Sequence, residues 1–227
     1  MSNIVYGKNS FFEALSNKRI TMAYVLNDSE IKDYRIPYKI VDRKTLDKMS
    51  KSGNHQGYLA EVKEFKMSNV EDMIQEKNGL IVLLDGLEDV HNLGAIVRTS
   101  ECAGVDGIIY KSHNSVKVND TVAKVASGAL EYVKIAEVTN LTKTIQYLKS
   151  KGYWIVGADG NCDKLYTDIK YDFNTVLIIG SEGKGISRLV KEECDYLVKL
   201  PMVGHVTSLN ASVAAGILIY NIQNSRK

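Results

Sequence analysis

Short, continuous runs of apolar residues recur along the chain from residue 80 onward, and they end in or next to Gly, Asp or Tyr. The runs lie in LIVLLDG (80–86), DGIIY (106–110), YWIVGADG (153–160) and TVLIIGSEG (175–183). Helical patterns such as NLGAIVRTSECAG and NLTKTIQYLKSKG separate them. Buried parallel strands have such apolar runs, and strands that alternate with helices form a parallel sheet covered on both faces. The pattern predicts an α/β domain over residues 80–227.

The first 66 residues have a different pattern, in which apolar and polar positions alternate over shorter stretches. NSFFEALSN and RKTLDKMSK have helical spacing, and Asp42 precedes the second of them as a candidate N-cap. The predicted strands of this part are ITMAYVLN, IPYKIVD and GYLAEVKEF. We therefore expect a small α/β domain over 1–66, a polar and weakly helical linker over 67–79, and the larger domain after it.

Composition places the chain among globular proteins. Its 227 residues are 44% hydrophobic and 25% charged, which allows a sizeable core. No apolar run approaches the roughly 18 residues that would span a bilayer, and the first residues do not have the pattern of a secretion signal. We expect a cytoplasmic protein without a membrane partner. Cys102, Cys162 and Cys194 have neither disulfide-framework nor zinc-site spacing, so we expect reduced cysteines and no metal.

Charge is distributed unevenly although the net charge is only +2. Residues 1–66 hold 12 Lys and Arg against 8 Asp and Glu, a net of +4, whereas residues 67–227 hold 17 against 19, a net of −2. A basic excess of this size is typical of a polyanion-binding element, although a solvated surface explains it equally well. It favours the first domain as the part that contacts nucleic acid.

Candidate chemistry lies in three loops that follow predicted strands, because parallel sheets bind ligands at the carboxyl ends of their strands. In LLDGLEDVHNLGAIVRT, either Asp89 or Asn92 can cap the helix that follows. Arg98 interrupts the apolar pattern of that helix, which indicates either a functional cation or a solvated position. In IIGSEGKGIS, the glycine spacing fits neither the dinucleotide fingerprint nor a P-loop.

The third loop, LPMVGHVTSLNASVAAG, leads into an apolar helix of small residues. Ser208 is the expected N-cap of this helix. Asn210 is then expected inside the first turn, where asparagine is a poor helix former. That position indicates a role for Asn210 other than helix formation.

Together the three loops resemble the SpoU, or TrmH, family of RNA ribose 2′-O-methyltransferases in the SPOUT superfamily. The family's N-x-G-x-x-x-R motif is matched by HNLGAIVRT, its G-x-E-G-x-G motif by IIGSEGKG, and its third motif by LPMVGHVTSLN. All three occur in the family's order across roughly residues 80–222. The first domain resembles the family's small RNA-binding domain, which NHQGYLAEV usually closes.

The resemblance implies a SPOUT α/β-knot fold, a parallel sheet with a C-terminal trefoil knot, behind a small N-terminal α/β RNA-binding domain. It also implies S-adenosylmethionine as the cofactor, RNA as the partner and a homodimer whose interface forms the active site. The residues implied as catalytic are Asn92, Arg98, Glu182, Ser208 and Asn210. Those implied to bind the cofactor are Gly157, Gly180, Leu200 and Leu209.

Two departures from the family pattern affect the choice of substrate. Val90 stands where relatives commonly have proline, and the first domain has a shortened segment between its first two predicted strands. The motif details are closest to the branch that methylates a guanosine ribose of 23S rRNA, and tRNA is the alternative substrate. Two other classes stay open, a catalytically silent RNA-binding or ribosome-assembly protein and a nicotinamide-dependent oxidoreductase, although the fingerprint of the latter is absent.

The sequence also leaves the proton acceptor open. The family's arginine has been assigned as a base, but a guanidinium resists deprotonation and commonly clamps a phosphate. We therefore expect Arg98 to bind an RNA phosphate. Glu182 is the alternative to Arg98 as the acceptor of the ribose proton. Asn92 and Asn210 are expected to orient these groups or the ribose.

Overall fold

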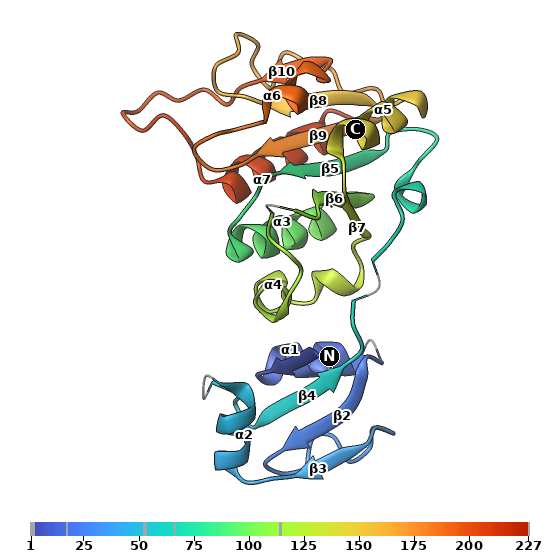
Figure 1. The fold of residues 1–227 in the computed structure, drawn as a ribbon, viewed down its shortest axis with the longest axis vertical. Helices are drawn as coiled ribbons and strands as arrows, with labels where there is room; N and C mark the ends of the chain where they lie inside the picture. The colour runs from blue at the N-terminus through green and yellow to red at the C-terminus, as the bar shows by residue number, and fades with distance from the viewer. Residues whose placement is uncertain (1–2, 17, 52–53, 66, 114, 227) are drawn as a thin grey trace.

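The chain forms two separate sheets in the computed structural model, which describes residues 3–16, 18–51, 54–65, 67–113 and 115–226. Figure 1 shows the smaller sheet at one end of an elongated molecule and the larger one at the other. Residue 66, the predicted end of the first domain, lies outside the described residues. No helix in the described ranges is long and apolar enough to cross a membrane.

The small sheet has four strands in the order β1-β4-β2-β3. Strand β4 pairs antiparallel with both β1 and β2, and β2 pairs parallel with β3. The sequence patterns predicted three of the strands and missed β1, which has only four residues. The strands are β1 Asn3–Tyr6, β2 Ile20–Val25, β3 Tyr38–Ile40 and β4 Tyr58–Val62.

Two helices, α1 (Lys8–Ser16) and α2 (Arg43–Ser50), accompany this sheet. Asp42 caps α2 as predicted, and its Oδ1 accepts a hydrogen bond from the Thr45 amide at 2.8 Å. The shortened segment between β2 and β3 is a hydrogen-bonded turn that buries Ile31 completely. The small domain thus has its own apolar core, separate from that of the larger sheet.

The large sheet is parallel throughout, and its strand order is β10-β8-β9-β5-β6-β7. Strand β5 lies near its centre with all six residues buried. The four apolar runs form β5, β6, β8 and β9, whereas β7 and β10, which have four and three residues, were not predicted. The strands are β5 Leu80–Asp85, β6 Gly107–Lys111, β7 Ile135–Val138, β8 Trp154–Ala158, β9 Thr175–Gly180 and β10 Tyr196–Val198.

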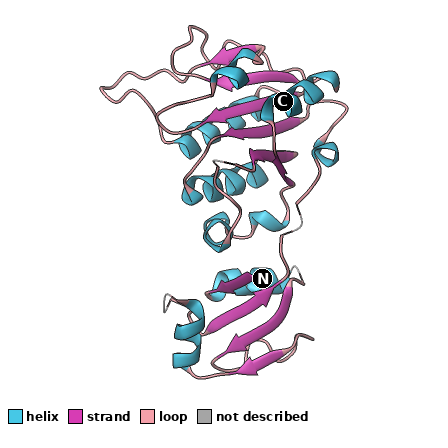
Figure 2. Cartoon of the chain, viewed as in Figure 1, coloured by secondary structure: helices cyan, strands magenta, loops and turns pink. Residues whose placement is uncertain are grey.

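Helices cover both faces of this sheet, as the alternating pattern predicted (Figure 2). Helices α3, α4 and α7 contribute to the core on one face, and α5 and α6 contribute to the core on the other. A short 3₁₀ helix, Val70–Met73, lies in the predicted linker, and a second, Ala129–Glu131, follows α4. The helices are α3 Val90–Cys102, α4 Asp120–Ala126, α5 Leu141–Ser150, α6 Arg188–Glu192 and α7 Ala211–Asn224.

The three cysteines are unpaired thiols. Burial raises the pKa of Cys194 to about 12, so this thiol stays protonated and packs as a small apolar group.

Candidate active site

The carboxyl ends of β5, β9 and β10 bring the three motif loops to one edge of the sheet. Strand β9 lies next to β5, and Asp85, the last residue of β5, pairs with Gly180, the last residue of β9. The third motif follows β10, which is separated from β9 by β8. Since all the strands are parallel, the loops that follow β5, β9 and β10 leave the sheet on the same side.

Glu182 is the point at which the three motifs meet. Its Oε1 accepts a hydrogen bond from the Asn92 side-chain amide, which comes from the first motif. It also accepts one from the Asn210 side-chain amide of the third motif at 3.3 Å. Asn92 is almost fully buried, whereas Glu182 and Asn210 are exposed. The two amide donors orient an exposed carboxylate, which makes Glu182 a candidate proton acceptor.

The loop that carries Glu182 is a tight turn closed by two backbone hydrogen bonds between Ser181 and Gly185, at 3.0 and 2.9 Å. Gly183 and Gly185 both have positive φ angles, +82° and +69°, which glycine adopts without strain. A Cβ atom on Gly180 would lie 2.2 Å from the carbonyl carbon of Gly185. Gly180 is therefore needed for its own loop to fold back over the strand end.

Asp85 anchors the other side of this loop, a role that the sequence analysis did not assign. It is 8% exposed, and its Oδ2 accepts a hydrogen bond from the Ser187 amide at 2.7 Å. The contact ties the end of the glycine-rich turn to the end of β5. An aspartate at the end of an otherwise apolar strand was the available signal.

Asn210, and not Ser208, is the N-cap of α7, which corrects the predicted position of that helix. The Asn210 Oδ1 accepts hydrogen bonds from the amides of Ser212 at 2.9 Å and Val213 at 3.3 Å. Both residue types are good caps, so composition could not distinguish them. With its oxygen on the helix amides and its nitrogen on Glu182, Asn210 joins the start of α7 to the candidate acceptor.

Ser208 lies in an exposed loop, residues 201–210, and is not part of the Glu182 cluster. Leu200 precedes this loop and packs against the core, while Leu209 near its other end is 40% exposed. The two leucines expected to bind the cofactor thus flank a loop with large solvent-facing apolar side chains. Val203, for example, is fully exposed.

Arg98 lies on α3 but outside the Glu182 cluster. Its side chain is exposed, and no hydrogen bond or ion pair joins it to another described residue. Arg98 is thus solvent-facing, and its guanidinium is free to contact a ligand. The helix begins at Val90 and is capped by Asp89, whose Oδ1 accepts a hydrogen bond from the His91 amide at 2.8 Å.

Two further glycines are explained by packing. A Cβ on Gly94 of the first motif would lie 2.6 Å from the Val125 Cβ, so this glycine allows α3 and α4 to approach closely. A Cβ on Gly157 would lie 2.8 Å from the Cys194 sulfur and 2.9 Å from Ile186 Cδ1. The space beside Gly157 is therefore filled by the protein's own side chains, and this chain offers only its backbone there.

Two known protein families match this chain. Residues 79–220 match the SpoU rRNA Methylase family, and residues 4–68 match the family described as RNA 2′-O ribose methyltransferase substrate binding. The chain belongs to the SpoU rRNA methylase family. This confirms the resemblance carried by the three motifs and makes the protein an RNA methyltransferase of the SpoU/TrmH type.

Individual relatives agree with this SpoU assignment. YacO of Bacillus subtilis (strain 168), named as a TrmH family tRNA/rRNA methyltransferase, is 40% identical over 238 residues, covering 98% of this chain and 95% of that protein. The fold is similar to the AdoMet complex of the SpoU methyltransferase AviRb from Streptomyces viridochromogenes, with a TM-score of 0.84, 21% identity and coverage of 98% and 89%. AdoMet-bound rRNA methyltransferase from Sinorhizobium meliloti gives a TM-score of 0.86, 22% identity and coverage of 98% and 87%. These likenesses confirm the predicted SPOUT fold class.

The SpoU chain shows no group of three or more His, Cys, Asp or Glu side chains suited to a metal ion among its described residues. The candidate site therefore consists of one positioned carboxylate, two amides, backbone groups and apolar side chains.

Proposed function

We propose that the protein transfers a methyl group from S-adenosylmethionine to the ribose 2′-hydroxyl of a guanosine in 23S rRNA. The observation that carries the proposal is the cluster of Asn92, Glu182 and Asn210, in which one residue from each motif meets at the carboxyl edge of the sheet. A catalytically silent RNA-binding protein would not need a carboxylate oriented by two side-chain amides, one buried and one at a helix N-cap. The nicotinamide alternative lacks the acidic ribose ligand of its fingerprint.

The residues at this edge suit the proposed cofactor. The carrier of the methyl group is a sulfonium joined to an adenosine, so its binding site needs apolar contacts and backbone groups that can form hydrogen bonds. Leu200 and Leu209 supply apolar surface, and the strand ends at Gly157 and Gly180 present backbone without side chains. When bound, S-adenosylmethionine supplies an electrophilic methyl group.

The protein's part in the chemistry is to position the ribose and to accept a proton. The 2′-hydroxyl must lose its proton as the oxygen attacks, and Glu182 is the group held ready to accept it, directly or through water. Asn92 and Asn210 fix the orientation of the carboxylate because both donate to the same oxygen. Ser208, in the exposed loop, is assigned to contact with the substrate ribose.

Arg98 is assigned as a clamp on an RNA phosphate, because its guanidinium is exposed and has no partner among the described residues. We expect Arg98→Lys to lower RNA affinity moderately, because the charge is kept and the planar guanidinium is lost. Arg98→Ala should lower RNA affinity by about tenfold or more, because one charge-assisted contact is lost. Neither variant should move the pH–rate profile. Methyl-transfer kinetics as a function of pH and RNA concentration measure both quantities. A profile displaced by one unit or more in Arg98→Lys, with RNA affinity unchanged, would identify Arg98 as the base instead.

The small basic domain is assigned to RNA binding. Helix α2 displays the solvent-facing cations Arg43, Lys44 and Lys48, and Lys51 follows it directly. Cations that neutralise phosphates supply much of the affinity of proteins for RNA. The basic small domain thus binds the RNA substrate, and the larger domain methylates it.

A homodimer is the assembly we propose, with α7 at its interface. Val213, Ile217 and Tyr220 are spaced for one side of this helix and are 50%, 39% and 46% exposed. The exposed apolar residues of the neighbouring loop, Met202, Val203, Val206 and Leu209, enlarge the apolar surface. A surface of this kind in a globular protein is typical of an interface.

Ile217→Asp tests that interface. An unpaired charge buried between subunits costs about 3–5 kcal/mol, so we expect dimer affinity to fall by at least about a hundredfold. Sedimentation velocity over a range of concentrations measures the change. Ile40→Asp, an equally apolar substitution site that is 59% exposed on β3, is the control and should stay dimeric. A wild-type chain that sediments as a monomer would overturn the proposed assembly.

The experiment that assigns the substrate is a map of 2′-O-methylated nucleotides in total RNA from cells with and without the protein. The proposal requires that one guanosine of 23S rRNA loses its modification. Loss of a tRNA modification would establish the alternative substrate, and no change in either RNA would refute both.

A further inference from the structure

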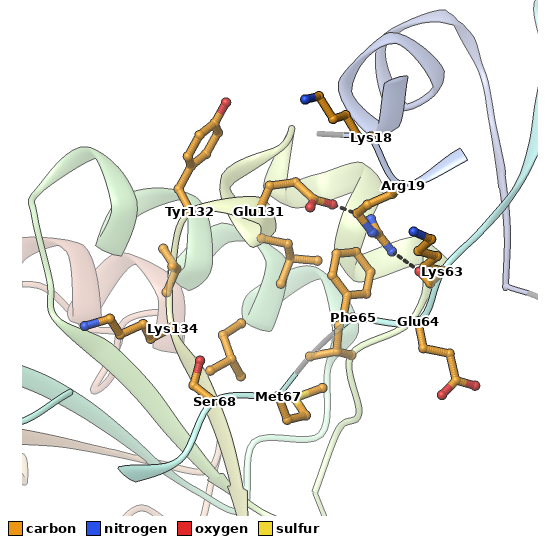
Figure 3. A pocket seen from close by; sticks show the side chains of 14 residues that line it. Lys18, Arg19, Lys63, Glu64, Phe65, Met67, Ser68, Glu131, Tyr132 and Lys134 are labelled. Carbon is orange, nitrogen blue, oxygen red and sulfur yellow. Dashed lines mark hydrogen bonds and ion pairs between the residues drawn. The ribbon is translucent and has the colours of Figure 1, made fainter. Parts of the chain in front are cut away.

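A cavity of about 420 Å³ lies between the two domains (Figure 3), and its described lining includes no residue of the Glu182 cluster. The small domain contributes Lys18, Arg19 and Lys63 to its lining, together with Phe65 on the connecting segment. The other wall is the segment that includes Tyr132 and Lys134, which lies between α4 and β7. The cavity is large enough for a small planar group and is open to solvent.

An ion pair holds the two walls together. Arg19 and Glu131 pair across the domains, and their side chains are only 11% and 12% exposed. The guanidinium lies over the ring of Phe65 at 3.7 Å and donates a second hydrogen bond to the Lys63 carbonyl at 2.8 Å. Burial raises the pKa of Glu131, and the bond from Arg19 opposes this change. These contacts thus join lining residues of the two domains beside the cavity.

The rim of the cavity is basic and carries an exposed aromatic ring. Among the described residues that line it, four are cations, Lys18, Arg19, Lys63 and Lys134, and two are anions, Glu64 and Glu131, so these six carry a net charge of +2. Tyr132 is 68% exposed. In Figure 3, Lys18 and Tyr132 project toward the same end of the cavity from opposite domains. Lys134 donates to the Asp72 carbonyl at 2.5 Å.

We propose that this junction is a second RNA-binding site, which takes one unpaired nucleotide of the substrate and its flanking phosphates. The base stacks on Tyr132, and Lys18 and Lys63 contact the phosphates. Exposed aromatic rings beside lysines recognise single-stranded nucleic acid in this way, because every base has a face for stacking and every nucleotide carries a charge. An acidic peptide would satisfy the lysines but would leave the ring of Tyr132 without a planar partner.

The inference rests on the proposed function, since it concerns the same RNA, and it has a consequence for substrate choice. A nucleotide bound between the domains fixes the position of the RNA relative to both the basic domain and the Glu182 cluster. The junction would therefore select RNA with an unpaired nucleotide at a set distance from the methylated ribose.

Substitution of Tyr132 in the full-length protein tests the site. The probe is a short fluorescein-labelled single-stranded RNA, and its affinity is measured by fluorescence anisotropy. We expect Tyr132→Ala to weaken binding about fivefold to a hundredfold, the range for one lost base stack, and Tyr132→Phe to retain the affinity. Tyr147→Ala, on α5 at the other face of the sheet, is the control and should bind RNA as the wild type does.

The lysines give a second, independent measure. Lys18→Gln combined with Lys63→Gln should lower the slope of log affinity against log salt by about 1.4, the value for two contacts to a single strand. S-adenosylmethionine affinity should not change in any of these variants, because none of the substituted residues belongs to the Glu182 cluster.

Two results would overturn the second site. One is an unchanged RNA affinity in Tyr132→Ala, and the other is displacement of the RNA by polyglutamate as effectively as by unlabelled RNA. Failure of the proposed function is distinguishable, because it would appear as absence of methyl transfer in the wild type. The effect of Tyr132 on RNA binding would still be measurable in that case.

Discussion

Gly180→Ala is expected to lower the affinity for S-adenosylmethionine by at least about tenfold and to abolish detectable methyl transfer. The added Cβ would lie 2.2 Å from the Gly185 carbonyl carbon and 2.4 Å from the Ile186 nitrogen. Both are backbone atoms, so the turn that carries Glu182 must move away from the strand end. Overpacking of this kind costs about 1–3 kcal/mol, and 1.4 kcal/mol already corresponds to a factor of ten.

Isothermal titration calorimetry measures the affinity, and a thermal unfolding curve establishes that the variant is folded. Gly160→Ala is the matched control, because a Cβ at that position meets no atom within 4 Å. The control should bind as the wild type does. Unchanged affinity in Gly180→Ala would mean that the cofactor binds away from this turn.

Glu182→Gln is expected to reduce the rate of methyl transfer by about a hundredfold or more while the affinity for S-adenosylmethionine changes little. A general base contributes about 10²–10⁴ to a rate, and an amide cannot accept the ribose proton. The side chain keeps its shape, and its oxygen can still accept from Asn92 and Asn210. The cluster should therefore stay in place while its chemistry is lost.

Single-turnover kinetics at saturating RNA measure the effect on the chemical step. Lys184→Gln, an exposed position in the same turn, is the control for altered loop charge. A Glu182→Gln variant with a normal rate would exclude this carboxylate as the proton acceptor. Arg98 would then be the remaining candidate for the base.

The sequence predicted the elements whose signals are long or chemically specific. The runs that became β5 and β9 have continuous apolar residues, and α2 has both helical spacing and a capping aspartate. The three motif loops were located correctly because parallel strands place their carboxyl ends at one edge. Strands β1, β7 and β10 were missed, and each has only three or four residues. The equally short β3 was predicted because it lies within the longer stretch IPYKIVD.

Details of the candidate site depended on contacts between distant residues, which a single sequence does not specify. Asn210 became the helix cap because its side chain satisfies two amides and also reaches Glu182, 28 residues away. Gly157 and Gly180 were expected to bind the cofactor, and the structure adds that atoms of the chain itself lie close beside both. The ion pair between Arg19 and Glu131 joins residues 112 positions apart, and no local pattern indicates it.

The most direct test of the central claim is nucleoside mass spectrometry of RNA after incubation with the pure protein and methyl-labelled S-adenosylmethionine. Unmodified 23S rRNA is the substrate, and Glu182→Gln is the negative control. We expect labelled 2′-O-methylguanosine with the wild type and almost none with the variant. Label on a base instead of a ribose, or no label with the wild type on either rRNA or tRNA, would contradict this expectation.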